Sequence, residues 1–416
     1  MELLSVFLSA LSTVVTILLL NLLGIGMSHY KLLTQRFLKQ LAGLSSKVFL
    51  PSLIFTGLSK GLTLEKLMLS GLLPFFAILH IGIAAAVGYF ARLFVKPSKE
   101  FWTPFLCACA FHNSSALPLV ITTALATQHP FSNDPNAFEK MSTYIFLYVT
   151  GWGILFWCCG YTSLLDSART VDLTETVDAE QPSTGKKNQV AWGRIGAALK
   201  KGFVNPPMIM TFVGIVVGIT PALKELFHGE RGAPLGFVAS AILILGQPAT
   251  GIVTLVIAGT LGGTVLDKIK YIKQSRKQLD SITASKELDQ HVNPLVVAGT
   301  HSKGEAAIDS QPPKAWPVKV LLWLCFFKLV VIGGIQFGVT AWLVPLIFPA
   351  DADPFLKLVL LIEASALPSA NLNLVICQQA GNKEAAETLS LAYILMYIGM
   401  LITLVVYLSL ALYIVF

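Results

Sequence analysis

The sequence carries the same tetrapeptide, Ser-Ala-Leu-Pro, at residues 115–118 and again at residues 365–368. Each copy lies inside a long apolar run, at 101–127 for the first and 354–380 for the second. Proline removes a backbone N–H and clashes with the carbonyl four residues earlier, so each copy is expected to interrupt a helix. In a bilayer, the freed backbone groups are tolerated only where protein or a water-lined cavity satisfies them. The repeat therefore predicts two interrupted helices that meet inside a membrane protein.

The composition points to the same class of protein. The chain has 416 residues, of which 54% are hydrophobic and 13% charged, and its mean hydropathy is +0.70. Soluble domains carry roughly 25% charged residues. These values exclude a soluble enzyme, a disordered regulator and a fibrous protein. The net charge of +7 sits in short stretches between apolar runs, so it favours orientation in a lipid bilayer over nucleic-acid binding.

A helix needs about 20 mainly apolar residues to cross a bilayer. Ten runs meet this requirement, at residues 5–27, 41–59, 68–95, 101–127, 141–165, 203–227, 233–263, 318–348, 354–380 and 386–416. The polar stretch 166–202 divides them five and five, and a second polar stretch occupies 264–317. We expect a first five-helix unit over 1–165, a cytosolic loop over 166–202, and a second unit over 203–416 with a cytosolic insertion at 264–317. Each loop is expected to have either a regulatory role or no role, and to take no part in transport.

The two units align as repeats. The second helix of each carries a proline, Pro51 and Pro248, separated by 197 residues, whereas the two tetrapeptides are 250 residues apart. The difference of 53 is about the length of the 264–317 insertion. Because five is odd, the second unit enters the membrane from the opposite face, as in many secondary transporters. The predicted fold is an all-α integral membrane protein of ten helices, arranged as two inverted five-helix repeats with crossed broken helices at the fourth and ninth spans.

Lysine and arginine give the orientation. In or beside the loops after the odd-numbered spans they number 23, against 5 for the loops after the even-numbered spans. Because basic residues are enriched in cytosolic loops, the odd loops are assigned to the cytosol. Both chain termini are then expected on the non-cytosolic side.

Polar side chains surround both prolines and form the candidate substrate site. They are Asn113, Ser114 and Ser115 beside Pro118, and Glu363, Ser365, Asn371 and Asn373 beside Pro368. The alternative is that proline kinks and small polar residues merely hold helices together. A carboxylate inside a span is a functional candidate by default, so Glu363 is a candidate for ion coupling, with a structural salt bridge as its alternative.

Lys328 and His112 are the other coupling candidates. Lys328 lies about ten residues into the eighth span and could instead extend its ammonium group to the interface. His112 could equally be a hydrogen-bonded packing residue. If Lys328 pairs with Glu363, the pair is a structural clamp.

Several short motifs resemble the auxin efflux carrier superfamily, and within it the PIN-LIKES proteins and their fungal and algal relatives. They are Phe111-His112-Asn113-Ser114-Ser115-Ala116-Leu117-Pro118, Asn205-Pro206-Pro207, Leu245-Gly246-Gln247-Pro248 with Gly259, Tyr148 with Trp157, Gly160, Tyr161 and Leu164-Leu165, and the segment 364–373. The resemblance implies inverted repeats, crossed broken helices, and export or sequestration of an organic anion such as an indole carboxylate. It also implies the endoplasmic reticulum membrane ahead of the plasma membrane, and it adds Asn205 to the candidate site.

The expected function is therefore secondary transport of a small organic anion by alternating access at a midplane site. A transporter-fold sensor without net transport is the alternative. An enzyme is disfavoured because the chain lacks HExxH, GxSxG and paired Asp motifs; a channel would not need matched broken helices. No catalytic residue, metal or cofactor is expected, the partners are the substrate and the bilayer, and a homodimer stays open beside the monomer.

The expected mechanism uses the helix breaks themselves. A half-helix that begins after each proline directs its N-terminal N–H groups at the crossing point, where they favour an anion. Asn113, Ser115, Ser365 and Asn371 add neutral donors. Ionised Glu363 would repel the anion and protonated Glu363 would tolerate it, which gives proton-sensitive binding without a metal.

Overall fold

The computed structural model describes residues 3–129, 131–165, 167, 206–229, 232–256, 258–260, 262–263, 266, 270, 273–274, 318–365, 367–379 and 382–416. In these residues the regular secondary structure is helical, and one isolated antiparallel bridge joins His112 and Ser369. The chain is thus an all-α protein, as its apolar runs predicted. Asn205 and nearly all of the two polar stretches lie outside the described residues.

Membrane-length helices account for most of the described chain. Seven helices in this part are long and apolar enough to cross a membrane, or eight if one bent pair counts as a span. The seven are Ala10–His29, Arg36–Gly61, Leu64–Val95, Ala137–Leu165, Gly236–Thr260, Val318–Ile347 and Ala385–Val415. This agrees with an integral multi-pass membrane protein.

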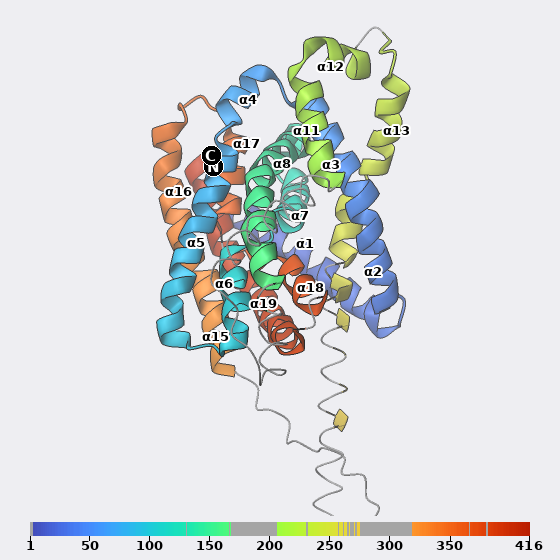
Figure 1. The fold of residues 1–416 in the computed structure, drawn as a ribbon. Coiled ribbons are helices and arrows are strands. Elements are labelled where there is room, and N and C mark those ends of the chain that lie inside the picture. Colours follow the sequence, from blue (N-terminus) through green and yellow to red (C-terminus); the bar gives the residue numbers. More distant parts are fainter. Residues whose placement is uncertain are drawn as a thin grey trace, which may run out of the picture.

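The helices form two groups that stand side by side (Figure 1). One group contains α2 (Gln35–Leu44), α3 (Leu50–Gly61), α11 (Pro206–Ile219) and α13 (Gly236–Gly246). The other contains α5 (Leu73–Val95), α6 (Lys99–Ala110), α15 (Val318–Phe326) and α16 (Gly333–Ile347). Between them lie α7 (Ala116–Ala126), α8 (Ala137–Leu155), α17 (Pro354–Glu363), α18 (Asn371–Gln379) and α19 (Lys383–Val415), and α1 (Leu3–His29) packs on α7 and α19.

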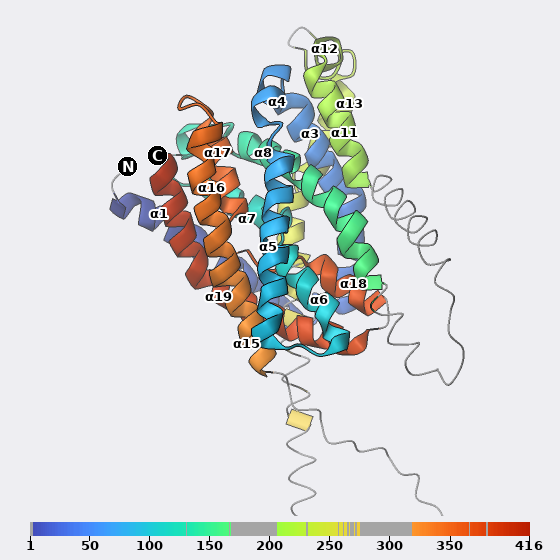
Figure 2. The same cartoon turned by 60° about the vertical axis from the view of Figure 1, so that its left-hand side comes forward.

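The sixth predicted span, 203–227, is not one straight helix. Its described part is α11 followed by α12 (Pro221–His228), and the two are bent by 103°. Pro221 begins α12 and has no N–H to donate back to α11, so the chain turns there. In both views α12 caps one end of the bundle beside α4 (Leu64–Ser70) (Figure 2).

The first and last helices reach that same end. The Phe131 ring, in the turn η2 (Phe131–Asn133) before α8, lies 5.2 Å from the Phe416 ring and 6.1 Å from the Phe355 ring at the start of α17. Figures 1 and 2 both draw the start of α1 close to the end of α19. Both ends of the chain therefore lie with the loops after the even-numbered spans.

Close packing of α11 on α3 depends on two glycines one helical turn apart. A Cβ added at Gly214 would lie 2.9 Å from Leu58 Cβ, and one added at Gly218 would lie 2.5 Å from the Leu58 carbonyl oxygen. Small residues spaced by four let membrane helices approach closely, because helix association in lipid depends on van der Waals packing. This pair of glycines permits the close contact between α11 and α3.

We expect Gly218→Ala to weaken this contact. The added methyl meets backbone, which cannot rotate away, and overpacking of this kind typically costs about 1–3 kcal/mol. The thermal midpoint of the purified protein, followed by fluorescence-detected size exclusion, should fall. Gly338→Ala in α16 is the matched control, because a Cβ there meets nothing within 4 Å. An equal midpoint for both variants would contradict the proposed packing.

Candidate functional site

Two interrupted helices cross at the centre of the site. Helix α6 ends at Ala110 and α7 begins at Ala116, while α17 ends at Glu363 and α18 begins at Asn371. The connecting segments run antiparallel: the Asn113 N–H donates to the Pro368 carbonyl at 2.9 Å, and the Ala370 N–H donates to the Phe111 carbonyl at 2.9 Å. The freed backbone of each break is thus satisfied by the other break.

The two prolines occupy different places. Pro368 lies within the second break, whereas Pro118 lies in the first turn of α7. A first-turn N–H has no partner in its own helix, so a proline costs nothing there. The expectation that both half-helices begin after the proline is correct for α18 and wrong for α7, which begins two residues before Pro118.

Three carbonyl groups in the last turn of α6 accept hydrogen bonds from side chains outside that helix. The Asn373 amide donates to the Cys107 carbonyl at 3.3 Å, and the Ser369 hydroxyl donates to the Ala108 carbonyl at 2.5 Å. The Lys328 ammonium donates to the Cys109 carbonyl at 2.5 Å. The Cys107 carbonyl also accepts from the Phe111 N–H at 2.9 Å, whereas those of Ala108 and Cys109 are carbonyls that a helix end leaves without an intrahelical partner. The second interrupted helix and the eighth predicted span therefore cap the end of α6.

Lys328 does not pair with Glu363 in the described part of the chain. It lies in η4 (Phe327–Ile332), a π-helical turn between α15 and α16, and is 2% exposed. Its ammonium group adds positive charge at the C-terminal end of α6, where the helix dipole is negative. The structure thus corrects the alternative of a Lys328–Glu363 clamp. Lys328 instead bonds a backbone carbonyl, that of Cys109.

The Glu363 carboxylate has His112 as its partner. Glu363 Oε2 lies 3.2 Å from His112 Nε2, which lies 3.4 Å from the Tyr148 hydroxyl. That hydroxyl lies 2.9 Å from His80 Nδ1, and His80 Nε2 lies 2.8 Å from the Thr340 hydroxyl. The five residues come from α17, the first break, α8, α5 and α16, and none is more than 2% exposed. We call this connected set the polar chain.

Two atoms of the polar chain still lack a hydrogen-bond partner among the described residues. They are Glu363 Oε1 and His112 Nδ1, and both are buried. Buried polar atoms without partners cost free energy, so each such group calls for an explanation. Here one acceptor and one imidazole nitrogen lie next to the crossing, where a proton or a polar group of a substrate could satisfy them.

The remaining candidate residues divide by their partners. Asn113 donates to the Tyr397 hydroxyl at 3.5 Å and accepts from the Leu117 N–H at 3.4 Å. Asn371 also bonds Tyr397. The Ser365 hydroxyl donates to the Ile362 carbonyl at 2.6 Å, so it serves the end of α17. Ser114 is buried within the first break, and Ser115 precedes α7 and is half-buried.

Comparison with known proteins identifies the family of the chain. Residues 9–274 match the family described as membrane transport protein. The chain belongs to this family. Its members include transporters of the auxin efflux carrier type, so the chain is a PIN-LIKES-type membrane transport protein and not an enzyme.

The relatives that it matches come from plants and fungi. The chain is 27% identical over 281 residues to Protein PIN-LIKES 1 of Arabidopsis thaliana, which covers 63% of the chain and 59% of that protein. It is 24% identical over 306 residues to Protein PIN-LIKES 3 of the same plant, covering 68% and 76%. An uncharacterized transporter of Schizosaccharomyces pombe is 23% identical over 332 residues, covering 63% and 73%. The chain thus spans less than two thirds of PIN-LIKES 1.

Sequence reasoning missed several partners in this membrane transport protein. His80, Tyr148 and Thr340 complete the polar chain, and Tyr397 joins the two asparagines. A histidine inside an apolar run was the available signal for His80, but nothing in the sequence pairs it with α16. In the described residues, no group of three His, Cys, Asp or Glu side chains is placed to hold a metal ion.

We expect Ser369→Ala to destabilise this PIN-LIKES-type protein. The change leaves the buried Ala108 carbonyl without its hydroxyl donor, which costs about 1–3 kcal/mol. The thermal midpoint in detergent should fall. Ser409→Ala is the matched control, because the buried Ser409 hydroxyl has no partner among the described residues and its loss should be neutral or stabilising. A smaller fall in the thermal midpoint for Ser369→Ala than for Ser409→Ala would refute the capping role of Ser369.

Proposed function

We propose that the protein is a secondary transporter that moves a small organic anion by alternating access at the crossing of its two interrupted helices. Family membership supports membrane transport, and the buried polar groups at the crossing support a site there. An indole carboxylate of the auxin type is the proposed substrate class, by resemblance to the PIN-LIKES proteins. The observation that carries the proposal is the pair of backbone hydrogen bonds between residues 111–113 and 368–370.

The proposal includes ten spans in two inverted five-helix repeats. Three predicted spans are not among the seven membrane-length helices: the bent pair α11–α12 would be the sixth, and the interrupted helices α6–α7 and α17–α18 would be the fourth and ninth. Their breaks pair in antiparallel fashion, which is the arrangement expected when repeats enter the membrane from opposite faces. Both chain ends lie with the even loops, which are poor in basic residues, so we propose that both termini are non-cytosolic.

The substrate's carboxylate would be held without a fixed counterion. The first N–H groups of α7 and α18 carry partial positive charge, and both helices begin at the crossing. Asn113, Ser115 and Asn371 add neutral donors. Because the Lys328 ammonium is already bonded to the Cys109 carbonyl, the anion would be oriented but not trapped by a buried ion pair.

Glu363 is the proposed coupling group. Its carboxylate is fully buried and its described partner, His112, is part of the polar chain. An ionised Glu363 would repel an anion at the crossing, and a proton on it would remove that repulsion. The polar chain gives this proton a hydrogen-bonded connection to His80 and Thr340 in two other helices.

Uptake of radiolabelled indole and aliphatic carboxylates into proteoliposomes tests the function. We expect saturable uptake that depends on the imposed proton gradient. Binding without flux would support the alternative, a transporter-fold sensor, and neither binding nor flux would contradict the substrate class. We propose the endoplasmic reticulum as the membrane, and both the monomer and a homodimer are compatible with this scheme.

We expect Glu363→Gln to abolish the pH response of uptake between about pH 5 and pH 8 while retaining substrate binding. Glutamine keeps the size and one acceptor but cannot lose a proton, so uptake should become uniform across pH. The reference is Glu387→Gln in α19, an exposed carboxylate whose loss should leave the wild-type profile. A Glu363→Gln profile that still follows the wild type would remove Glu363 from the mechanism.

A further inference from the structure

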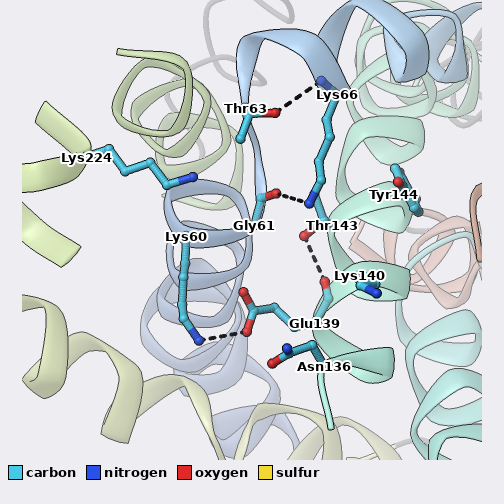
Figure 3. Close-up of a pocket in the computed structure, with 10 residues that line it drawn as sticks. All are labelled: Lys60, Gly61, Thr63, Lys66, Asn136, Glu139, Lys140, Thr143, Tyr144 and Lys224. Carbon is cyan, nitrogen blue, oxygen red and sulfur yellow. Dashed lines mark hydrogen bonds and ion pairs between the residues drawn. The ribbon is translucent and has the colours of Figure 1, made fainter. Parts of the chain in front are cut away.

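A second, basic cavity lies at the end of the bundle that carries α4 and α12. It has a volume of about 240 Å³ and is formed by the end of α3, the start of α4, the start of α8, and α12 (Figure 3). A water molecule takes up about 30 Å³, so a small organic or inorganic anion fits. Its charged lining side chains are Lys60, Lys66, Lys140, Lys224 and Glu139. We call it the basic cavity.

The lysines are unusual for this end of the protein. The loops after the even-numbered spans hold 5 basic residues in the whole sequence, and four of these line the basic cavity. Basic residues are depleted on the side of a membrane protein that is translocated. Solvation of the surface in general therefore does not explain why four of these five basic residues line one cavity.

Two of the four ammonium groups are neutralised by carboxylates. Lys60 pairs with Glu139 at 2.9 Å, and Lys140 pairs with Asp134 at 2.6 Å. Lys66 donates to the Gly61 carbonyl at 3.0 Å and Lys224 donates to the Leu62 carbonyl at 2.9 Å. Neither Lys66 nor Lys224 forms an ion pair with a described residue. The ammonium groups of Lys66 and Lys224 are thus hydrogen-bonded to neutral carbonyl groups, and no described carboxylate pairs with them.

These two charges are close enough to repel each other. Their acceptors belong to successive residues of one connection, and Figure 3 shows both side chains reaching toward it from opposite sides. Burial, followed by the nearby Lys66 ammonium, lowers the pKa of Lys224, and the Glu139 carboxylate opposes this shift. Lys60 and Lys140 are already paired with Glu139 and Asp134, so the unpaired positive charge of the cavity lies on Lys66 and Lys224. An anion between Lys66 and Lys224 would relieve this repulsion.

We propose that Lys66 and Lys224 form an oxyanion-binding site for a carboxylate or phosphate group in the basic cavity. The site is separate from the crossing and does not depend on the proposed transport activity. The ammonium groups give charge-assisted hydrogen bonds to the oxyanion. Because Lys66 lies on α4 and Lys224 on α12, a bound oxyanion joins the connection before α5 to the cap formed by α12.

The test uses the full-length protein purified in a neutral detergent, with inorganic phosphate as the probe. At constant ionic strength, phosphate should raise the thermal midpoint in a saturable manner and chloride should not. Lys66→Gln and Lys224→Gln should each raise the phosphate dissociation constant about tenfold. Lys66→Arg and Lys224→Arg should keep phosphate binding, which separates loss of the site from misfolding.

Lys357→Gln is the matched control. Lys357 also donates to a backbone carbonyl, that of Ala350 at 3.0 Å, but does not line the basic cavity. This variant should bind phosphate as the wild type does. Equal phosphate binding by wild type, Lys66→Gln and Lys224→Gln would overturn the proposal.

A lipid phosphate could supply the same oxyanion. The second arm therefore compares nanodiscs of phosphatidylcholine alone with nanodiscs that also contain phosphatidic acid. Stabilisation by phosphatidic acid that both Lys→Gln variants lose, without an effect of free phosphate, would support the site with a lipid headgroup as its ligand. No stabilisation by either phosphate source would overturn it.

Discussion

Two backbone hydrogen bonds, between Asn113 and Pro368 and between Phe111 and Ala370, are the interaction on which the rest of the structure depends. In lipid there is no water to satisfy an interrupted helix, and each unsatisfied backbone group costs several kcal/mol. One break alone would therefore be expensive, whereas two crossed breaks satisfy each other. As a consequence, two segments about 250 residues apart in the sequence are held in a fixed relative position.

The polar side chains near the crossing follow from that constraint. Because α6 stops at Ala110, its last carbonyls need donors. Ser369 and Lys328 provide them to Ala108 and Cys109 from two other segments, and Asn373 adds a second donor to Cys107. The polar chain from Glu363 to Thr340 then extends through the first break and three more helices. Any movement of one half-helix would disturb contacts that both interrupted helices share. This makes the crossing a suitable place for binding to alter conformation.

The sequence predicted the positions of the breaks because proline and the repeated tetrapeptide act locally. It also identified the polar residues beside them, since polar groups are rare in apolar runs. It did not give the partners: Lys328 bonds the Cys109 carbonyl, and Glu363 faces His112. Such pairings depend on how helices rotate and pack, which short motifs do not encode. The bend at Pro221 was missed for a simpler reason, because the apolar run continues through it.

The most direct test of alternating access at the crossing is the accessibility of position 115. Ser115 is half-buried at the start of α7, so Ser115→Cys, with Cys158 and Cys159 changed to serine, can report on both sides of the membrane. A membrane-impermeant maleimide would be applied to each face of oriented vesicles. Alternating access at the crossing predicts labelling from either face, with protection by a transported carboxylate on both. Labelling from one face alone, unchanged by any transported carboxylate, would contradict it.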